Sequence, residues 1–487
     1  MRSNARTRLC VMLILFGFGA SLRSDLADDV RASMRQAGRH WATKVASHGG
    51  YVWEYSTDFV TRRRGESKDL PLSTVWVQAG TPMVGQAFLR AYRATGETLY
   101  LDAAVAAAEC LAYGQLESGG WTYSIEFDPK LVKHHYHHFV GKKAKGRNTT
   151  TFDDNNTQSA TRFLMDVDAL VDNPKIDDAV ARALACFLAA QYKGGNWDGA
   201  WPQRYVPPKK GYGRYPTFND GTMGDCVKTM VKAYRQYDKP EYLDSVKRCL
   251  DFYLRSQIAA PQASWAQQYD SDLKPAWARR FEPPSVTGGE SCGNCHVLMD
   301  MYVEFGDQTY LDAVGRCVEW YRNSRIGGRE GNGRWARFYE LKTNKPLYFT
   351  RTYKLTFKDD DLPVHYSFQS NYGVDRMIRH YEALRKKGRD KALAQRARTP
   401  TAKEWRNKAS VLAGEVKKLL ADQDEEGRWV RRVPKRNQFR DSKGRIGYRV
   451  DKNTMLQMIY SRTFVRNMRT LSDYLTATQK GPKITDE

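Results

Sequence analysis

Gln115-Leu-Glu-Ser-Gly-Gly-Trp121 is the first of five related phrases that divide this chain of 487 residues. Each phrase ends a stretch of helical periodicity with a Gly- or Ser-containing turn and a tryptophan. The others are Gln191-Tyr-Lys-Gly-Gly-Asn-Trp197, Gln257 through Ser264-Trp265, Gly331-Asn-Gly-Arg-Trp335 and Gln423 through Gly427-Arg-Trp429. Successive tryptophans are 76, 68, 70 and 94 residues apart, which leaves room for two helices in each interval. The pattern predicts an array of helical hairpins.

Apolar residues at three- and four-residue spacing mark the helices of these hairpins. The predicted helical segments are 85–94, 100–113, 158–170, 179–191, 221–237, 242–257 and 295–305. A turn followed by Tyr-Leu-Asp starts a helix at Tyr100, Tyr242 and Tyr310. One unit used repeatedly predicts an all-α fold, an (α/α) toroid or barrel of helical hairpins, with minor short β-ribbons near the tryptophan turns.

The first 24 residues have the pattern of a secretory signal peptide. Arg2, Arg6 and Arg8 precede an apolar run over 9–18, and small residues follow it. The run is short for a membrane span, although an uncleaved anchor is the alternative. We therefore expect residues 1–24 to be removed and the mature protein to be secreted or periplasmic, without stable membrane insertion.

The remaining chain divides by composition near residue 375. Residues 25–375 are expected to form the toroid. A lysine- and arginine-rich run at 385–398 then opens a basic helical extension over 376–487, with a further helix predicted at 401–420. This extension either stands beside the ring or completes it.

Positive charge predicts an acidic partner. Lys and Arg number 78 against 55 Asp and Glu, for a formal net charge of +23, which becomes +19 without residues 1–24 and their four arginines. Charge alone is compatible with nucleic acid, anionic lipid or acidic glycan. Because an exported protein does not meet nucleic acid, we expect an acidic polysaccharide as the partner, bound by a monomer.

The cysteines give weaker signals. Those inside apolar helical patterns are expected to be small buried hydrophobes: Cys110, Cys186, Cys249 and Cys317. Cys292-Gly-Asn-Cys295 predicts either a local disulfide or core thiols, because a zinc site would need a second ligand pair nearby.

Two aspartate-containing turns precede apolar helices 67 residues apart. They are Thr151-Phe152-Asp153-Asp154-Asn155 and Thr217-Phe218-Asn219-Asp220. Helix capping would explain one such turn, but its repetition favours two helix starts that face a common cleft. Their oxygen ligands suit a hard divalent cation such as Ca²⁺, and the basic chain around them suits an acidic polymer.

Two loops add candidates for contact with a polymer. Between the acidic turns, Trp201 and Tyr205 are either sugar-stacking or packing residues, and Arg214 could pair with a carboxylate. The segment His134-His135-Tyr136-His137-His138, followed by Lys142, Lys143 and Lys145, is either a zinc site or a basic rim that touches polyanion.

Six ordered blocks resemble polysaccharide lyase family 10, the helical-toroid pectate lyases. The blocks are 151–164, 201–205, 217–223, 265–270, 278–291 and 335–346, within a resemblance that spans about 81–351. The resemblance implies Ca²⁺-assisted β-elimination of polygalacturonate, or of a related polyuronate.

The resemblance also implies roles for individual residues. It places Asp153 and Asp220 on the calcium ion and the substrate carboxylate, and Arg279 of Ala278-Arg-Arg-Phe-Glu282 as the catalytic base. Substrate contacts are expected from Arg351, Arg214, Asp154, Trp201 and Arg337. The family usually has asparagine where this chain has Asp154, and the extra acid either strengthens cation binding or caps the helix.

The expected reaction has one chemical difficulty and two alternatives. Arginine normally stays protonated, so removal of the C5 proton by Arg279 predicts a rate that rises toward alkaline pH. A toroidal glycoside hydrolase would instead use Asp153 and Asp220 as a carboxyl pair roughly 6.5 to 9.5 Å apart. A non-catalytic protein that binds acidic glycans would keep the rim without the base.

Overall fold

Helical hairpins form the body of the protein. The computed structural model describes residues 25–65, 68–139, 146–328, 333–364, 366–440 and 446–481, so the predicted signal peptide and Lys142, Lys143 and Lys145 lie outside the described residues. The hairpins are α2 (Thr81–Thr95) with α3 (Thr98–Tyr113), α4 (Asn156–Asp168) with α5 (Pro174–Ala190), α6 (Thr222–Tyr237) with α7 (Pro240–Ser256), and α8 (Gly288–Phe305) with α9 (Gln308–Asn323). They confirm all seven predicted helical segments and the helix starting at Tyr310.

The turns inside three hairpins explain the Tyr-Leu-Asp pattern. Gly96, Asp238 and Gly306 end α2, α6 and α8 in the left-handed conformation, with φ of 75°, 51° and 81°. Such a residue reverses the chain directly after a helix, and glycine adopts it without steric cost. The next helix then begins within three residues, antiparallel to the first.

The recurring glutamines connect neighbouring hairpins. The side-chain amide of Gln191 donates to the carbonyl of Gly199 in its own turn and to that of Ser245 in α7, both at 2.8 Å. Gln115 and Gln257 bridge their own turns to α5 and α9 in the same way. Because each amide satisfies carbonyls on two elements, the glutamine sets the position of one hairpin against the next.

The recurring tryptophans lock each turn onto the preceding helix. Their indole N–H groups donate to main-chain carbonyls at 2.8 to 2.9 Å; these tryptophans are Trp121, Trp201, Trp265, Trp335 and Trp429. The second member of the repeat is therefore Trp201. Trp197, which the sequence pattern selected, is only partly buried and donates to the carbonyl of Asp270 in another loop.

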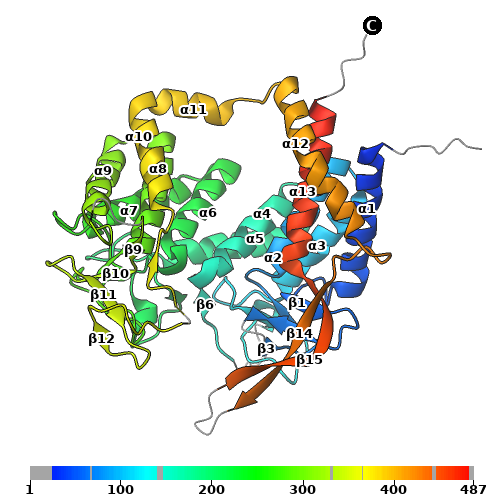
Figure 1. Cartoon of the computed structure of the whole chain (residues 1–487), viewed down its shortest axis with the longest axis horizontal. Helices are drawn as coiled ribbons and strands as arrows, with labels where there is room; N and C mark the ends of the chain where they lie inside the picture. Colours follow the sequence, from blue (N-terminus) through cyan, green and yellow to red (C-terminus); the bar gives the residue numbers. More distant parts are fainter. Residues whose placement is uncertain are drawn as a thin grey trace, which may run out of the picture.

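The two ends of the described chain pack together. The terminal helices are α1 (Leu26–His40), α10 (Val374–Lys387), α11 (Arg389–Ala397), α12 (Ala402–Ala421) and α13 (Ser461–Lys480). Helix α13 packs on α12 and α2, and Figure 1 shows α11 crossing from α10 to α12. Gln423, after α12, donates to the carbonyl of Ser33 in α1 just as the other glutamines bridge hairpins. The C-terminal helices thus share one hydrophobic core with the N-terminal ones.

Most strands are short. Those of two to four residues are β1 (Glu54–Ser56), β2 (Arg62–Arg64), β3 (Lys68–Asp69), β4 (Thr74–Trp76), β5 (Ser124–Glu126), β6 (Thr150–Thr151), β7 (Arg204–Tyr205), β8 (Val286–Thr287), β9 (Trp335–Ala336), β10 (Phe338–Tyr339), β11 (Pro346–Phe349), β12 (Leu355–Thr356) and β13 (Gln369–Ser370). The longer strands β14 (Arg431–Arg440) and β15 (Ile446–Tyr460) form a hairpin, and β15 pairs with β1 in a five-stranded antiparallel sheet of order β14-β15-β1-β2-β3.

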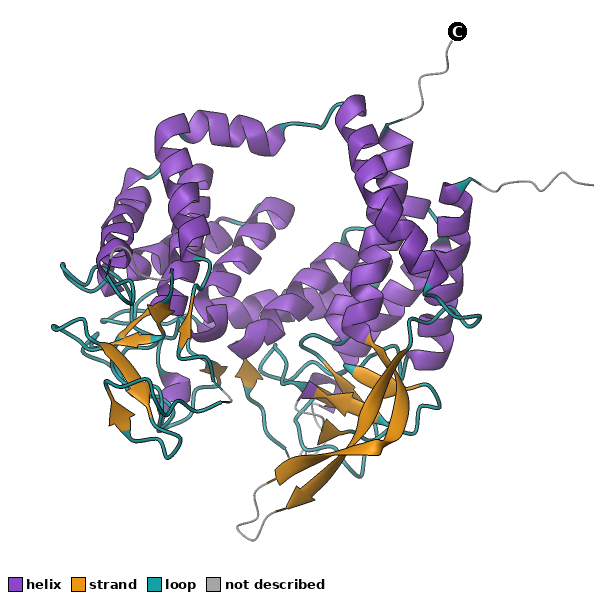
Figure 2. Ribbon diagram, viewed as in Figure 1, coloured by secondary structure: helices purple, strands orange, loops and turns teal. Residues whose placement is uncertain are grey.

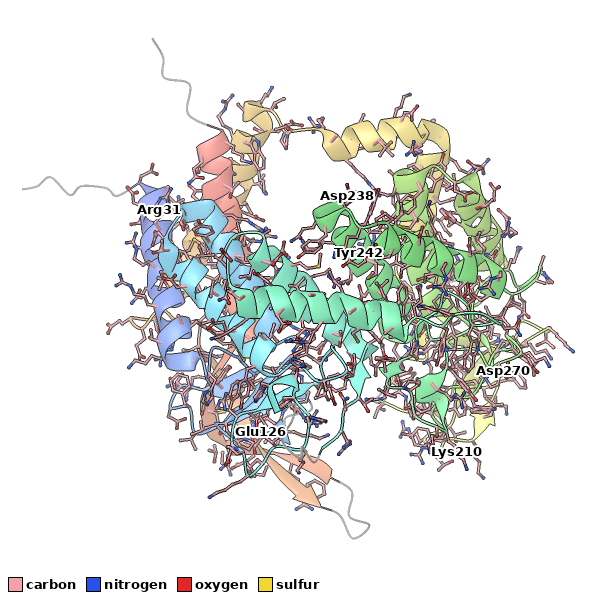
Figure 3. The ribbon with its side chains drawn as sticks, turned by 180° about the vertical axis from the view of Figure 1, so that it is seen from behind. Arg31, Glu126, Lys210, Asp238, Tyr242 and Asp270 are labelled. Atoms are coloured by element: carbon pink, nitrogen blue, oxygen red, sulfur yellow. The ribbon has the colours of Figure 1, made fainter. Side chains whose placement is uncertain are left out.

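Strands and long loops gather at one end of the helical layer (Figure 2). Figure 3, seen from behind, places Glu126, Lys210 and Asp270 on this loop side and Asp238, the residue directly after α6, away from it. Because Asp238 follows the C-terminus of α6, the N-terminus of α6 points to the loop side. The acidic turns at the starts of α4 and α6 therefore open toward the loops.

The cysteines of the described residues, which comprise all seven after residue 24, are free and buried. Cys292 and Cys295 thus form core thiols and no local disulfide. Within the same described part of the chain, no helix is long and apolar enough to cross a membrane.

Candidate active site

The two acidic turns have the same backbone conformation. They form single turns of 3-10 helix, η4 (Asp153–Asn155) and η6 (Asn219–Gly221). Asp154 has φ 53° and ψ 27°, and Asp220 has φ 48° and ψ 28°. Non-glycine residues adopt this left-handed region rarely, most often when they are Asp or Asn. Structurally, Asp154 therefore corresponds to Asp220, and Asp153 corresponds to Asn219, in agreement with the Thr-Phe that precedes each turn. The two expected metal ligands, Asp153 and Asp220, thus occupy successive and not equivalent positions of the turn.

A threonine holds each turn. The hydroxyl of Thr151 accepts from the N–H of Asp153 at 3.3 Å, and that of Thr217 accepts from the N–H of Asn219 at 3.1 Å. The threonines supply the same local acceptor in both turns, which explains why Thr-Phe precedes each acidic pair. Both turns then lead directly into helices that pack against each other, α4 and α6.

The turns bring three carboxylates together. One oxygen from each of Asp153, Asp154 and Asp220 lies within 4.8 Å of the other two. The hydroxyl of Tyr123 lies 3.1 Å from Oδ2 of Asp153 and 3.1 Å from Oδ2 of Asp154, so it can donate to either. Oδ1 of Asp153 is buried and has no hydrogen-bond partner.

Crowding of these acids changes their proton affinity. Desolvation, followed by repulsion from Asp154, raises the pKa of Asp153. Desolvation, with repulsion from Asp153, Asp154 and Glu290, raises the pKa of Asp220 to about 6, although Arg337 acts in the opposite direction and the residue as a whole stays accessible to solvent. Such a cluster is unfavourable without a positive charge, which a proton or a metal ion can supply.

The donor set fits a hard divalent cation. Three carboxylates offer oxygen ligands, which Ca²⁺ prefers, and the unpartnered Oδ1 of Asp153 is a buried acceptor without a donor. Over the described ranges of the chain, no other group of three His, Cys, Asp or Glu residues comes close enough to hold a metal ion.

The histidine loop forms no metal site within its described residues. Nδ1 of His135 lies 3.1 Å from Glu117, and Nδ1 of His138 lies 2.9 Å from the carbonyl of Tyr113, with its ring packed on the Tyr113 ring. These contacts do not support the zinc alternative.

Arg279 is held by a buried glutamate. Its Nε lies 2.8 Å from Oε2 of Glu282, its Nη2 lies 2.5 Å from Oε1, and its backbone N–H also donates to Oε2. The Glu282 side chain is 1% exposed and that of Arg279 is 43% exposed. Gln267 and Tyr366 also donate to Oε1 of Glu282. The guanidinium therefore has a fixed orientation, and Nη1 makes no hydrogen bond to the described part of the chain.

The pKa values of this pair diverge. The hydrogen bonds that Arg279 donates to Glu282 outweigh the effect of burial and raise the pKa of Arg279 above its already high ordinary value. Burial raises the pKa of Glu282, but hydrogen bonds from Arg279 and Gln267 outweigh it and the net pKa is lowered. Arg279 is therefore a firmly charged cation in the free protein.

A chain of hydrogen bonds joins Arg279 to the acidic cluster. Beyond Glu282, the Gln267 amide donates to Oδ1 of Asn219 at 2.7 Å, and the Asn219 amide donates to Oδ2 of Asp220 at 2.6 Å. The cluster and Arg279 line one cavity of about 270 Å³. Its other walls include Gln203, Tyr212, Gln268 and Tyr366.

Arg337 lies in a neighbouring cavity of about 280 Å³ that shares Asp220 as a wall. Its Nη2 pairs with Glu290 at 3.0 Å, and its guanidinium lies 4.2 Å from the centre of the Tyr366 ring. Burial acts to lower the pKa of Arg337, but Glu290 and other neighbours outweigh it and the pKa is raised. Arg337 thus places a fixed positive charge beside the acidic cluster.

The other predicted substrate contacts lie elsewhere. Trp201 is fully buried, so the prediction that it contacts substrate is wrong. Its ring packs in the core, and its indole N–H donates to the Phe187 carbonyl. Arg214 is exposed, donates to the Lys209 carbonyl and lies over the Trp197 ring. Arg351 is 68% exposed and pairs with Asp361 at 3.3 Å. Neither arginine lines the cavity that contains Arg279.

Several site residues escaped sequence reasoning. Glu282 stands three residues after Arg279 in a motif already noted, but only the fold shows that it is buried against the guanidinium. The second residue after four of the repeat tryptophans lines the site or its neighbouring cavity or contacts the acidic cluster: Tyr123, Gln203, Gln267 and Arg337. Arg337 was among the expected substrate contacts, and this regular position would have revealed the other three, had the second tryptophan been identified as Trp201.

Comparisons with known proteins place the chain among carbohydrate-active enzymes. The model of a family described as pectic acid lyase matches residues 115–374. No curated protein matches the sequence. A mutant of the family 10 polysaccharide lyase from Cellvibrio cellulosa, solved in complex with trigalacturonic acid, is 22% identical, with a TM-score of 0.47 over 62% of this chain and 98% of that chain. Another structure of that lyase is 23% identical, with a TM-score of 0.46 over 62% and 96%. A family 76 α-mannanase from Bacteroides thetaiotaomicron is 9% identical, with a TM-score of 0.42 over 93% and 96%.

Proposed function

This chain belongs to the pectic acid lyase family and is a pectate lyase, and we propose that it is secreted and cleaves polygalacturonate by cation-assisted β-elimination with Arg279 as the base. The observation that carries the mechanism is one cavity that holds a cluster of three carboxylates together with a rigidly oriented arginine. The signal-peptide pattern of residues 1–24 supports secretion.

Asp153, Asp154 and Asp220 would hold the cation, for which Ca²⁺ is the proposed identity because all three ligands are hard oxygens. When bound, the ion would supply positive charge that neutralises a uronate carboxylate and so makes the adjacent C5 proton more acidic. Tyr123 orients two of the carboxylates by hydrogen bonding. Arg337, in the adjoining cavity, is proposed to bind the carboxylate of a neighbouring sugar, since its charge already faces Asp220.

Arg279 is proposed to take the C5 proton through Nη1, the nitrogen that Glu282 leaves unused. The electron pair of the broken C5–H bond forms the C4–C5 double bond, the C4–O4 bond breaks, and the departing O4 oxygen takes up a proton from solvent. Glu282 fixes the geometry, but it also raises the pKa of Arg279, so the neutral guanidine is scarce. The rate should therefore rise with pH throughout the range in which the protein stays folded.

The spacing of the acids disfavours the hydrolase alternative. An inverting glycosidase needs carboxyl groups roughly 6.5 to 9.5 Å apart, and a retaining one needs about 5 to 5.5 Å. One oxygen of Asp153 lies within 4.8 Å of one oxygen of Asp220, which is shorter than the separation of an inverting pair and suits a shared cation.

Ultraviolet absorbance of the unsaturated product tests the proposal directly. The wild type should produce it from polygalacturonate, and a chelator should abolish the signal until Ca²⁺ is restored. Arg279→Ala should reduce the rate at least about a hundredfold, as expected for loss of a general base. Arg280→Ala is the matched control, because this neighbouring arginine lies over the Tyr353 ring and outside the cavity. Full activity of Arg279→Ala, or reducing ends without unsaturation, would refute the mechanism.

A further inference from the structure

A second cavity with aromatic and basic walls lies beside the five-stranded sheet. It has a volume of about 290 Å³ and is lined by residues from both ends of the chain. The lining residues are Trp53, Glu54, Gly65, Ala79, Arg436, Tyr460 and Arg462. All of them lie outside residues 115–374, the segment that the family model matches, so membership of the family assigns them no role. We call it the sheet cavity.

The aromatic wall of the sheet cavity is fixed in place. The Trp53 indole N–H donates to the Gln78 carbonyl at 3.0 Å, and the Trp53 carbonyl accepts from the N–H of Ser461. A Cβ atom at Gly65 would lie 2.3 Å from the Trp53 ring, so glycine allows the backbone of β2 to end directly against it. Tyr460, only partly buried, ends β15 and pairs with Glu54 across the sheet. Two aromatic rings thus border a cavity that stays open to solvent.

The polar groups of the sheet cavity match an acidic sugar. Arg462 is exposed at the start of α13 and makes no hydrogen bond or ion pair with the described residues. Arg436 on β14 is also exposed and lines the same cavity. A guanidinium can donate two parallel hydrogen bonds to one carboxylate. The single acid of the lining, Glu54, can accept hydrogen bonds from sugar hydroxyl groups. Two arginines against one glutamate leave the lining with a net positive charge.

Contacts connect the sheet cavity to the active site. The carbonyl of Gln78 accepts from the Trp53 indole, and the backbone N–H of Gln78 donates to Oδ1 of Asn156, the first residue of α4 after the acidic turn. On the same flank, Arg64 lies 4.9 Å from the Trp76 ring, and Trp76 stacks on Tyr123 at 5.9 Å. Tyr123 in turn contacts Asp153 and Asp154. A row of flat side chains therefore leads from the acidic cluster toward the sheet.

We propose that the sheet cavity is a secondary binding site for a uronate residue of the same acidic polysaccharide. Arg436 and Arg462 bind the carboxylate of this uronate residue. Trp53 and Tyr460 contact its sugar ring, and Glu54 accepts hydrogen bonds from its hydroxyl groups. The site rests on the proposed function, because it recognises the polymer that the active site cleaves. It gives long chains a second point of attachment, whose contribution grows once a chain is long enough to reach both sites.

Binding of galacturonate oligomers of different lengths tests this site. The Arg279→Ala variant would be titrated calorimetrically, in the presence of Ca²⁺, with trigalacturonate and with long oligogalacturonates. Combining both Arg436→Ala and Arg462→Ala with Arg279→Ala should weaken binding of the long oligomers about tenfold more than binding of the trimer. This tenfold difference corresponds to loss of one charge-assisted contact. Arg379→Ala together with Arg385→Ala is the control, since these two exposed arginines on α10 remove the same charge from another part of the ring.

The outcomes separate the inference from the function on which it rests. If the substitutions weaken binding of short and long oligomers equally, or not at all, while the melting temperature is unchanged, the sheet cavity is not a binding site for the polymer. Restoration of long-chain affinity by lysine at both positions would support charge recognition there. If neither length binds any variant and the wild type yields no unsaturated product, the proposed substrate is wrong, which overturns both proposals together.

Discussion

Lowering the pH should release the cation from the acidic cluster well above the range in which ordinary aspartates titrate. The pKa of Asp220 is raised from 3.8 to about 6 in the cation-free protein. With that value, about nine-tenths of Asp220 is ionised at pH 7 and about one-tenth at pH 5. Because a proton and the cation compete for the carboxylate, Ca²⁺ affinity should fall about tenfold between these two values. Asp153, whose pKa is also raised, acts in the same direction.

The same shift makes a prediction about stability. Since the folded protein binds this proton more tightly than the unfolded chain, the cation-free protein should lose stability as the pH rises from about 4 to about 6. Added Ca²⁺ should reverse that loss at pH 7. Thermal unfolding with and without the ion, across this pH range, measures both effects.

The Asp154→Asn variant isolates the origin of the shift. Asparagine tolerates the left-handed backbone at this position and still offers Tyr123 an acceptor. Its neutral side chain removes one source of repulsion, so Ca²⁺ affinity at pH 7 should fall and the decline with pH should move to lower pH. Isothermal titration calorimetry measures both, with the exposed Asp172→Asn as the charge-matched control. Affinity that is constant between pH 5 and 7, or equal in both variants, would refute the coupling of the three acids.

Four further outcomes follow from the structure. Arg279→Lys should lower kcat at least about a hundredfold, because an ammonium cannot match the two-point contact with Glu282, whereas Arg280→Lys should retain activity; equal rates would contradict this. Trp201→Phe should lower the free energy of unfolding in denaturant by about 2 to 4 kcal/mol, because it leaves a cavity and an unpaired Phe187 carbonyl, and it should leave KM unchanged. A raised KM with unchanged stability would instead indicate that Trp201 contacts substrate. Gln423→Ala should cost about 1 to 3 kcal/mol, seen as a lower Tm, because it removes the hydrogen bonds to the Ser33 carbonyl in α1 and to the Gly427 carbonyl in its own turn. A reducing agent should leave Tm unchanged, since the cysteines of the described chain are free.

The repeated sequence pattern determined the helical hairpins. Helix periodicity, the Tyr-Leu-Asp starts and the turn glycines are local signals, because they depend on backbone preferences and on contacts between residues three and four positions apart. Every predicted helical segment up to 305 was therefore found. The short motifs that contain Asp153, Asp220 and Arg279 also showed the resemblance to a known family, because each motif spans only a few consecutive residues.

Only the tertiary structure decided which residues are equivalent and which of them meet. Trp197 and Trp201 both suit the repeat by spacing, but burial and the bond to Phe187 select Trp201. The approach of Asp153, Asp154 and Asp220 to within 4.8 Å of one another likewise depends on how α4 and α6 pack.

The electrostatic state of the site likewise depends on contacts between segments far apart in the chain. Tyr123 and Asp220 reach the same cluster from hairpins about a hundred residues apart, and Arg279 is more strongly protonated than usual because Glu282 is buried against it. The residue types that bear chemistry were thus readable from the sequence. Their pKa values, their partners and the sheet cavity formed by the two ends of the chain were set by folding, because burial and proximity exist only once the hairpins have packed into the ring.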